Sequence, residues 1–458
     1  MELAPGMKCV VIGLGASGLA AVRFLREQGL RVSVSEARPA ESLAANDLTL
    51  LGELGVDWEA GGHRAEFFRE AELIVPSPGV PLDLPVLRAA RERGATIAGE
   101  LAIAAGYLRA PVIAITGSNG KTTVTSLIGH LLRSAGRETF VGGNIGTPVL
   151  EYLRGSRPAE AIVLELSSFQ LEIGGAFRPD IALLLNLTPD HLDRHGGMAG
   201  YVAAKRRIFV NQKAGDWAIL GGDDPLVMAE EVATGATVFR FGATPGCEAR
   251  VNEQGVLLSL EIGGRKIEEE YDMQATTLAS IINRLNAAAA ILAVRVFGCA
   301  PEAIRAGLAD YEPPAHRMAL VAERDGVRYV DDSKGTNIGA VAAALASSGE
   351  RVILIAGGRN KGSDFRPLAE SVRRHVRHLI LIGEAAAQMA AELGSLVPTS
   401  RAASMREAVR QASEIAEPGD TVLLSPACAS FDMFTSYAHR GEVFRQAVRE
   451  LAAVHHGG

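Results

Sequence analysis

Short apolar runs recur along the chain and alternate with longer segments in which apolar residues return every three or four positions. The clearest runs are KCVVIGLG, VIAIT, AIVLEL, IALLLN, RVILIAGG, HLILIGE and TVLLSPA. Continuous apolar strands of this kind are typical of parallel sheets that are covered by helices on both faces. The pattern therefore predicts an α/β fold built from three such units.

Two proline-containing segments divide this pattern. The polar turn Arg109-Ala110-Pro111 precedes the run VIAIT, and Glu312-Pro313-Pro314 forms a rigid linker. In the second unit, VLLSLEIGGRKIEEE alternates across a Gly-Gly turn and predicts a β-hairpin, and residues 277–297 have the pattern of a helix. The three domains that we predict comprise residues 1–109, 110–313 and 314–458.

Composition narrows the class of protein. With a net charge of −7 and a pI near 5.9, the chain does not favour broad binding to nucleic acid or membrane surfaces. No apolar run approaches the roughly twenty residues of a membrane span, and MELAPGMKCVVIG predicts a strand rather than a signal peptide. The four cysteines lack C-x-x-C spacing, which favours reduced thiols over a zinc site or disulfides. We expect a soluble cytoplasmic protein with neither nucleic-acid nor membrane partners.

The stretch VIAITGSNGKTT joins an apolar run to a glycine-spaced turn. Gly117 and Gly120 allow a tight turn whose N–H groups point inward at the start of a helix, which forms a phosphate cradle. Lys121 would reach the terminal phosphates, and Thr122 or Thr123 would bind Mg²⁺. The first glycine comes too late for the common G-x-x-x-x-G-K-[ST] spacing, so an ordinary strand-turn-helix junction is the alternative. The buried strand before the turn and the amphipathic segment after it favour the phosphate loop.

A second glycine turn, Gly13-Leu-Gly15-Ala-Ser-Gly18, follows the first predicted strand. Glu36 ends the next strand about twenty residues further on, as in dinucleotide-binding domains. Because such a turn holds any pyrophosphate and such a carboxylate binds any ribose diol, the motif predicts a nucleotide diphosphate. Nicotinamide chemistry and a Rossmann-like domain without a ligand are the alternatives. The fold predicted is thus a Rossmann-like first domain, a central P-loop-type ATPase domain and a Rossmann-like third domain.

In the second domain, polar residues interrupt buried runs or follow them at the ends of predicted strands. Open α/β sheets bind their ligands at such strand ends. Glu165 interrupts AIVLELSSFQ, and because burying an unpaired carboxylate is costly we expect Mg²⁺ or a cation beside it, with a salt bridge as the alternative. Lys205 lies between apolar neighbours in YVAAKRRIF, where spacing alone favours a solvated helix face. The loop after LLLNLT is dense in ionisable residues, each of which singly suits a turn or cap: Asp190, His191, Asp193 and Arg194.

The third domain carries charged and hydroxyl groups at the ends of three predicted strands, in DGVRYVDDSKGTN, AGGRNKGSDF and LSPACAS. Singly these residues suit caps and turns, but together they would converge on one carboxylate or phosphate. The group comprises Asp331, Asp332, Ser333, Lys334, Thr336, Lys361, Ser425 and Ser430.

Several segments occur in a recognisable order: ITGSNGKTT, GGNIGTP, LELSSFQLE, LTPDHLDRH, AAKRRIF, the pair His316-Arg317, DDSKGTN, GGRNKG and LSPACASFDMF. In these segments, from the first glycine turn nearly to the C-terminus, the chain resembles the Mur ligases, ATP-dependent enzymes that add amino acids in peptidoglycan synthesis. Its compact first domain, with SPACASFD and GGRNKGSDF, resembles the branch that adds D-glutamate. The D-N-P-R motif of the branches that add diaminopimelate or lysine does not occur in the sequence.

The resemblance implies roles for matching residues. Magnesium would be held by Thr122, Glu165 and His191, directly or through water. Lys205 matches a lysine that is carbamylated by CO₂, a change that turns an ammonium into an anionic group able to support Mg²⁺. The implied catalytic set is Lys121, His191, Lys205, Arg317 and Lys334. The implied ATP site comprises Gly117, Ser118, Asn119, Gly120, Lys121, Thr122, Thr123, Asn283, Asn286, Arg317 and Asp332.

The resemblance also implies two further substrates, UDP-N-acetylmuramoyl-L-alanine and D-glutamate, and we expect a monomer. The UDP-linked substrate would contact Ser17, Glu36, Arg38, Ser77 and Asn144. The D-glutamate pocket would comprise Lys334, Thr336, Lys361, Ser430 and Phe431, with Tyr437 where Phe is frequent. The related folylpolyglutamate synthetases lack the first glycine-turn domain. A dehydrogenase leaves the phosphate loop without a task, and a non-catalytic nucleotide-binding protein needs no amino-acid pocket.

Overall fold

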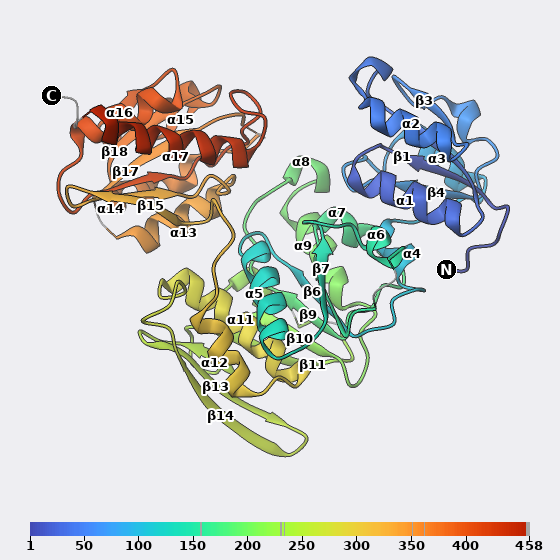
Figure 1. Cartoon of the computed structure of the whole chain (residues 1–458), viewed down its shortest axis with the longest axis horizontal. Coiled ribbons are helices and arrows are strands. Elements are labelled where there is room, and N and C mark those ends of the chain that lie inside the picture. Colours follow the sequence, from blue (N-terminus) through green and yellow to red (C-terminus); the bar gives the residue numbers. More distant parts are fainter. Residues whose placement is uncertain (156–157, 230, 233, 350, 361, 455–458) are drawn as a thin grey trace. The chain divides into compact units, whose positions relative to one another are not determined.

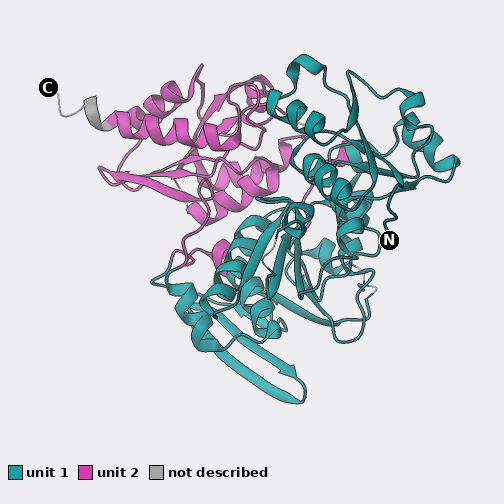
Figure 2. Cartoon of the chain, turned by 45° about the vertical axis from the view of Figure 1, so that its right-hand side comes forward, with its two compact units in different colours: residues 1–186, 194–276, 285–310 teal, residues 187–193, 277–284, 311–458 magenta. Residues whose placement is uncertain are grey.

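The computed structural model describes residues 1–155, 158–229, 231–232, 234–349, 351–360 and 362–454, with residues 452–454 described by backbone only. Three sheets follow one another along the chain, each with its own helices (Figure 1). By internal contacts the chain forms two compact units, which Figure 2 colours separately. Unit 1 holds the first two sheets and comprises residues 1–186, 194–276 and 285–310; unit 2 holds the third and comprises residues 187–193, 277–284 and 311–458.

The first sheet is parallel throughout, with strand order β3-β2-β1-β4-β5. Its strands are β1 (Lys8–Ile12), β2 (Arg31–Glu36), β3 (Asp57–Ala60), β4 (Leu73–Pro76) and β5 (Thr96–Ile97). Its helices are α1 (Ala16–Glu27), η1 (Ala40–Ser42), α2 (Ala45–Glu53), η2 (Ala65–Phe68), α3 (Pro85–Glu92) and α4 (Glu100–Ala104). The glycine turn directly follows β1, the middle strand. It therefore lies at the carboxyl edge of the sheet, where such folds bind ligands.

The second sheet has the order β14-β13-β12-β11-β10-β9-β6-β8-β7 and is parallel from β12 to β7. Its strands are β6 (Val112–Thr116), β7 (Thr139–Gly143), β8 (Ala161–Glu165), β9 (Ile181–Leu184), β10 (Trp217–Gly221), β11 (Thr237–Gly242), β12 (Ala249–Val251), β13 (Gly255–Ile262) and β14 (Arg265–Asp272). The helices are α5 (Lys121–Ser134), α6 (Val149–Leu153), α7 (Ser168–Glu172), α8 (Leu192–His195), α9 (Met198–Arg206), η3 (Arg207–Phe209), α10 (Pro225–Met228), α11 (Ile281–Phe297) and α12 (Pro301–Ala309).

Two local predictions are tested in this region. The predicted hairpin is confirmed, because β13 and β14 pair antiparallel and Ile262 faces Arg265 across the glycine turn. The predicted helix begins at Ile281 rather than at residue 277.

The third sheet has the order β15-β16-β20-β17-β18-β19, and only β15 runs antiparallel to its neighbour. Its strands are β15 (Ala319–Arg324), β16 (Val327–Asp331), β17 (Val352–Gly357), β18 (Val376–Ile382), β19 (Thr399–Arg401) and β20 (Thr421–Leu424). The helices are α13 (Ile338–Ser348), η4 (Arg366–Leu368), α14 (Ala369–His375), α15 (Ala386–Leu393), α16 (Met405–Ile415) and α17 (Tyr437–Val454).

Alternation along β17 shows how helices cover both faces of this sheet. Leu354 packs in a buried cluster with Val341 of α13, whereas its neighbour Ile355 packs in another cluster with Phe444 of α17. A strand buried on both faces is continuously apolar, as the run RVILIAGG is. The α/β prediction is confirmed, with three mainly parallel sheets.

The last strand of the first sheet ends at Ile97, and the first strand of the second begins at Val112. Between α12 and β15, residues 310–318 lead to the third sheet.

In the part of the chain that the structure describes, no helix combines the length and apolar character that a bilayer span requires.

Candidate active site

The loop after β6 turns sharply at two glycines. Gly117 has φ 150° and Gly120 has φ 83°, conformations that other residues rarely adopt. A Cβ atom on Gly117 would lie 3.0 Å from Cβ of Leu185, and one on Gly120 would lie 2.5 Å from Oδ1 of Asn286. The loop leads directly into α5, whose first N–H groups have no partner within the helix. This is the geometry of an anion site at a helix N-terminus.

Asn186 holds this loop from the neighbouring strand, because it follows β9, which pairs with β6. Its side chain accepts a hydrogen bond from the N–H of Asn119 at 2.8 Å and donates one to the Asn119 carbonyl at 3.0 Å. Its own carbonyl accepts from the N–H of Ser118 at 2.9 Å. Our sequence prediction missed Asn186, although a polar residue directly after the run IALLL was an available signal.

Two lysines converge on one carbonyl of the loop. Nζ of Lys121 donates to the carbonyl oxygens of Gly117 at 2.7 Å and Ser118 at 2.9 Å. Nζ of Lys205, on α9, donates to the same Gly117 oxygen at 2.8 Å and lies 4.8 Å from the centre of the Tyr201 ring. Lys205 is only 2% exposed, so the solvated helix face that spacing favoured is wrong. The carbonyl and the ring supply the polar partners that a buried ammonium needs.

Glu165 lies at the end of β8, beside the start of α5, and is buried. Its Oε2 accepts from the hydroxyl of Thr122 at 2.7 Å, and its Oε1 accepts from the amide of Asn144 at 2.9 Å. Both donors are neutral, unlike the basic partner that we weighed from the sequence. A carboxylate and a hydroxyl fit Mg²⁺, which usually takes one or two protein carboxylates and fills its shell with water and substrate phosphates. Within the described ranges no group of three or more His, Cys, Asp or Glu would hold a metal alone.

Three residues expected at the ATP and magnesium sites divide between the two units. Asn286 belongs to unit 1, where its side chain approaches the phosphate loop. His191 and Asn283 belong to unit 2, in its segments 187–193 and 277–284, and Figure 2 colours this unit magenta. Nε2 of His191 lies 3.7 Å from Oδ1 of Asp190, and the amide of Asn283 donates to the Thr277 carbonyl at 3.2 Å. The convergence of these residues on one nucleotide stays a prediction.

The N-terminal glycine turn is arranged around Glu36. Its carboxylate accepts from the N–H groups of Leu14 at 2.7 Å and Arg38 at 2.9 Å, and the Arg38 guanidinium donates to both oxygens. Burial acts to raise the pKa of Glu36, but these bonds outweigh it and lower the pKa to about 2. Ser77 follows β4 and donates its hydroxyl to the Gly13 carbonyl at 3.2 Å. Three residues predicted to bind the UDP-linked substrate therefore meet at one turn.

In unit 2, β16, β20 and β17 are neighbouring strands, so the three predicted loops follow adjacent strand ends. Asp332, after β16, accepts from the hydroxyl of Ser425, after β20, at 2.8 Å. Burial raises the pKa of Asp332 to about 7, although the Ser425 bond and the charge of Arg317 act to lower it. Nδ1 of His316 lies 2.6 Å from Oδ2 of Asp331.

Arg440 joins two of these loops from α17 and is fully buried. Its guanidinium donates to the hydroxyl of Ser333 at 3.0 Å, to the Ser333 carbonyl at 2.8 Å and to the Cys428 carbonyl at 3.1 Å. Burial lowers the pKa of Arg440 to about 10. Our sequence prediction missed it because an arginine on a helix is usually solvated. Lys361, on the third loop, lies outside the described residues.

The remaining residues of the predicted D-glutamate pocket differ in exposure. Nζ of Lys334 lies 3.8 Å from the centre of the Tyr437 ring, a cation–π contact that orients the ammonium. Ser430 is buried, Thr336 is half-buried and Phe431 is 65% exposed. An exposed aromatic ring beside buried polar groups suits the mouth of a binding site.

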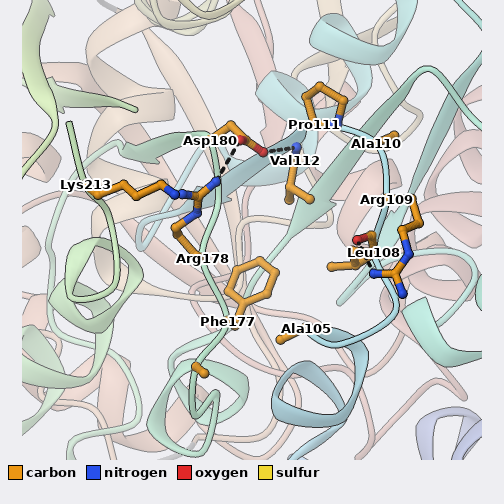
Figure 3. A pocket seen from close by; sticks show the side chains of 11 residues that line it. Ala105, Leu108, Arg109, Ala110, Pro111, Val112, Phe177, Arg178, Asp180 and Lys213 are labelled. Carbon is orange, nitrogen blue, oxygen red and sulfur yellow. Dashed lines mark hydrogen bonds and ion pairs between the residues drawn. The ribbon is translucent and has the colours of Figure 1, made fainter. Parts of the chain in front are cut away.

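A cavity of about 540 Å³ opens at the amino end of β6, opposite the phosphate loop (Figure 3). There Asp180 accepts from the N–H of Val112 at 2.8 Å and from Arg178 at 3.3 Å. Lys213 is exposed on its rim. Because ligands of open α/β sheets bind at the carboxyl ends of strands, we assign this cavity no part in the reaction.

Curated relatives match the chain over nearly its whole length. It is 48% identical to the UDP-N-acetylmuramoylalanine–D-glutamate ligase of Desulfotalea psychrophila, over 97% of this chain and 96% of that protein. It is 44% identical to the enzyme of that name from Pelobacter propionicus, over 97% of this chain and 99% of the relative. Family matches cover three consecutive regions: the MurD-like N-terminal domain (7–99), the Mur ligase middle domain (115–294) and the Mur ligase glutamate ligase domain (316–428).

The chain belongs to the Mur ligase family. Solved Mur ligases share its fold: a pseudomurein peptide ligase type C from Methanothermus fervidus has a TM-score of 0.59 at 18% identity, covering 97% of this chain and 100% of that one. A MurF ligase from Thermotoga maritima in complex with ADP has a TM-score of 0.58 at 19% identity, covering 97% and 96%. These likenesses concern the fold and confirm the predicted three-domain α/β architecture. Membership of the Mur ligase family also removes the need for a dehydrogenase to explain the first glycine turn.

Proposed function

We infer that this Mur ligase uses ATP to join D-glutamate to UDP-N-acetylmuramoyl-L-alanine in peptidoglycan precursor synthesis. Two relatives that are named UDP-N-acetylmuramoylalanine–D-glutamate ligase are 48% and 44% identical to this chain over nearly its full length. In the structure, the inference is carried by the phosphate loop, where Lys121 and Lys205 meet beside the buried Glu165. Cations and a metal-binding carboxylate at one helix N-terminus suit transfer of a phosphoryl group.

The chemistry starts from a carboxylate, which is a poor electrophile. One oxygen of the substrate carboxylate attacks the γ-phosphorus of ATP, the bond to ADP breaks, and an acyl phosphate forms. The amine of D-glutamate then attacks the carbonyl carbon, loses a proton and expels inorganic phosphate from the tetrahedral intermediate. Since water hydrolyses an acyl phosphate, we expect the ATP-binding and amino-acid-binding domains to close before chemistry.

The phosphate loop would hold ATP through its N–H groups, with Lys121 turning from the loop carbonyls to the terminal phosphates. Arg317 would contact the phosphates, Asp332 the ribose, and Asn283 and Asn286 the adenine. Magnesium, when bound to Thr122, Glu165 and His191, would offset phosphate charge. Each preorganised contact to the transferring group is worth about 3 to 4 kcal/mol of transition-state stabilisation.

Lys205 is proposed to carry a carbamate. Its uncharged amine would add to the carbon of CO₂ and release one proton, leaving an anionic group on the buried side chain. Burial beside Gly117 and the reach of Nζ to this loop support the proposal, because a carboxylate-like group there would face the magnesium region.

D-Glutamate has two carboxylates and needs two separated sets of donors. Thr336 and Lys361 would hold one carboxylate, and Ser430 with the N–H groups around Phe431 would hold the other, while Lys334 approaches the reacting phosphoryl group. Inverting the α-carbon while both ends stay anchored would turn the amine away from the acyl phosphate. A displacement near 1 Å costs about a hundredfold in rate.

The UDP-linked substrate would bind the first glycine turn through Ser17, Glu36, Arg38 and Ser77, with Asn144 at its muramoyl group. We propose domains at residues 1–109, 110–313 and 314–458, and an enzyme that acts as a monomer in the cytoplasm.

The proposal is tested by incubating the protein with ATP, UDP-N-acetylmuramoyl-L-alanine and single amino acids while ADP is measured. We expect ADP release to require both partners and to favour D-glutamate over L-glutamate by about a hundredfold. Comparable turnover with L-alanine or L-lysine would place the chain on another branch of the family. Substrate-dependent reduction of NAD or NADP would contradict the ligase assignment.

A further inference from the structure

Glu100 is a buried carboxyl group in unit 1 that the predicted site does not include. It is the first residue of α4 and only 5% exposed. Its Oε1 accepts from the N–H of Leu150 at 3.1 Å, and the N–H of Val149 and the hydroxyl of Ser17 also contact the carboxyl. Oε2 has no partner of good hydrogen-bond geometry among the described residues, so the Leu150 bond is the well-formed contact of this carboxyl group. Burial raises the pKa of Glu100 against these contacts.

The backbone around Glu100 is fixed by close packing. The N–H of Gly99 donates to the Ile173 carbonyl at 3.1 Å, and a Cβ atom on Gly99 would lie 2.8 Å from Cγ1 of Ile173. A Cβ atom on Gly175 would lie 2.8 Å from Cβ of Ala102, within α4. The start of α4 is therefore closely packed against the segment that contains Ile173 and Gly175, which limits how far the carboxyl group can move.

The Leu150 bond ties the carboxyl of Glu100 to the start of α6, and the hydroxyl of Ser17, at the start of α1, acts on the same carboxyl. These helices also meet further along, where Arg154 donates to Glu27 at 2.8 Å and Arg23 lies 3.5 Å from Glu151. The latter pairs are partly exposed to solvent, so they hold the helices together only weakly. The buried carboxyl at the other end is the polar contact that water does not weaken.

Each of these helix starts adjoins a segment assigned to the same substrate. Ser17 lies in the first turn of α1, within the glycine turn. Helix α6 follows the segment GGNIGTP, which carries Asn144, and Asn144 is itself fixed by its bond to Glu165. One molecule of the UDP-linked substrate would span both segments, with its nucleotide at the first and its muramoyl group at the second.

We propose that Glu100 is a positioning residue for the UDP-linked substrate: it sets the spacing between the glycine turn and the segment that carries Asn144. The proposal rests on the proposed function. It requires that the loss of the Glu100 carboxyl change the KM for the UDP-linked substrate more than the KM values for the other two substrates. ATP and D-glutamate contact neither helix start in the assignment above.

The test is steady-state ADP release by the full chain, with each substrate varied in turn. Glu100→Leu places an apolar side chain of similar length at this site, removes both oxygens and leaves the Leu150 N–H without this acceptor. We expect it to raise the KM for UDP-N-acetylmuramoyl-L-alanine about tenfold, and the KM values for ATP and D-glutamate less than about twofold. Glu100→Asp, one methylene shorter, should give an intermediate rise. Glu100→Gln, which keeps an acceptor for Leu150, should stay near the wild type.

Glu92→Gln, at an exposed glutamate of α3, is the matched control and should behave as the wild type. An equal rise in all three KM values with a lower melting temperature would overturn the proposal and make Glu100 merely structural. An unchanged KM for the UDP-linked substrate in Glu100→Leu would overturn it as well. If Glu100→Leu does not fold, Glu100→Asp decides in the same way, through its KM for the UDP-linked substrate compared with its KM values for ATP and D-glutamate. A wild-type protein that does not use the UDP-linked substrate would instead overturn the proposed function.

Discussion

The two glycine turns of unit 1 occupy matching places in different sheets, yet the ionisable side chains that their backbones bind have opposite charges. Each follows an interior parallel strand and leads into a long helix, β1 into α1 and β6 into α5. At the first turn the backbone N–H of Leu14 donates to the carboxylate of Glu36, which is also paired with the Arg38 guanidinium. At the second turn the ammonium of Lys121 donates to the carbonyls of Gly117 and Ser118.

This difference separates holding a nucleotide from reacting with one. A carboxylate fixed by an arginine can accept hydrogen bonds from sugar hydroxyls, but it cannot stabilise negative charge on a transferring phosphoryl group. An ammonium on the loop can do so, and the carboxylate of Glu165 on the neighbouring strand would extend that capacity if it binds the proposed magnesium. Glycine spacing alone therefore indicates an anion site, and the charged side chain beside it indicates whether that site suits binding or phosphoryl transfer.

Among the variants that test this comparison, we expect Lys121→Ala to have the largest effect on activity. Removing the ammonium should lower kcat at least about 10²- to 10³-fold, because its contact strengthens as charge develops on the phosphoryl group. The KM for the UDP-linked substrate should stay near the wild-type value, since none of the residues proposed to bind that substrate lies on the phosphate loop. ADP release and circular dichroism are the measurements.

Lys213→Ala is the control for this lysine substitution. Lys213 is exposed at the opposite end of β6, on the rim of the cavity in Figure 3, and the variant should keep wild-type activity. An unfolded spectrum for Lys121→Ala would make that residue structural, and activity within a few-fold of the wild type would remove the distinction between the two turns.

Lys205→Ala should have the next largest effect. We expect activity to fall about a hundredfold and to recover in part when acetate or formate is added, because a small carboxylate would replace the carbamate beside the metal. The same carboxylate should not rescue Lys121→Ala, whose missing group is a cation. Full activity of Lys205→Ala would refute the carbamate and leave the lysine as a buried brace of the loop.

The sequence predicted what depends on neighbouring residues and missed what depends on distant ones. The glycines of the phosphate loop and the hairpin turn act within a few positions, so their spacing sufficed. Asn186 bonds Asn119 across 67 positions, and Arg440 bonds Ser333 across 107. No local motif marked Arg440, and the only local signal for Asn186 was its place directly after an apolar run. Lys205 shows the same limit, since its burial depends on a strand end elsewhere in the chain, and only the family resemblance singled it out.

The smallest expected effect concerns Glu36 at the first turn. Burial would raise the pKa of its carboxyl, but the bonds from Arg38 and Leu14 lower it to about 2, below the usual value of 4.5. A lowered folded-state pKa stabilises the fold above the unfolded pKa, and this contribution is lost as the pH falls from about 4.5 through 2. Glu36→Gln cannot titrate, so its melting temperature should fall less than that of the wild type between about pH 5 and pH 2.5. Glu41→Gln, at an exposed glutamate of the same region, should follow the wild type.

At neutral pH, Glu36→Gln should raise the KM for the UDP-linked substrate a few-fold and leave that for ATP unchanged, because the carboxylate serves the first turn alone. Identical pH profiles for wild type and Glu36→Gln would show that the carboxylate is not held as the structure indicates.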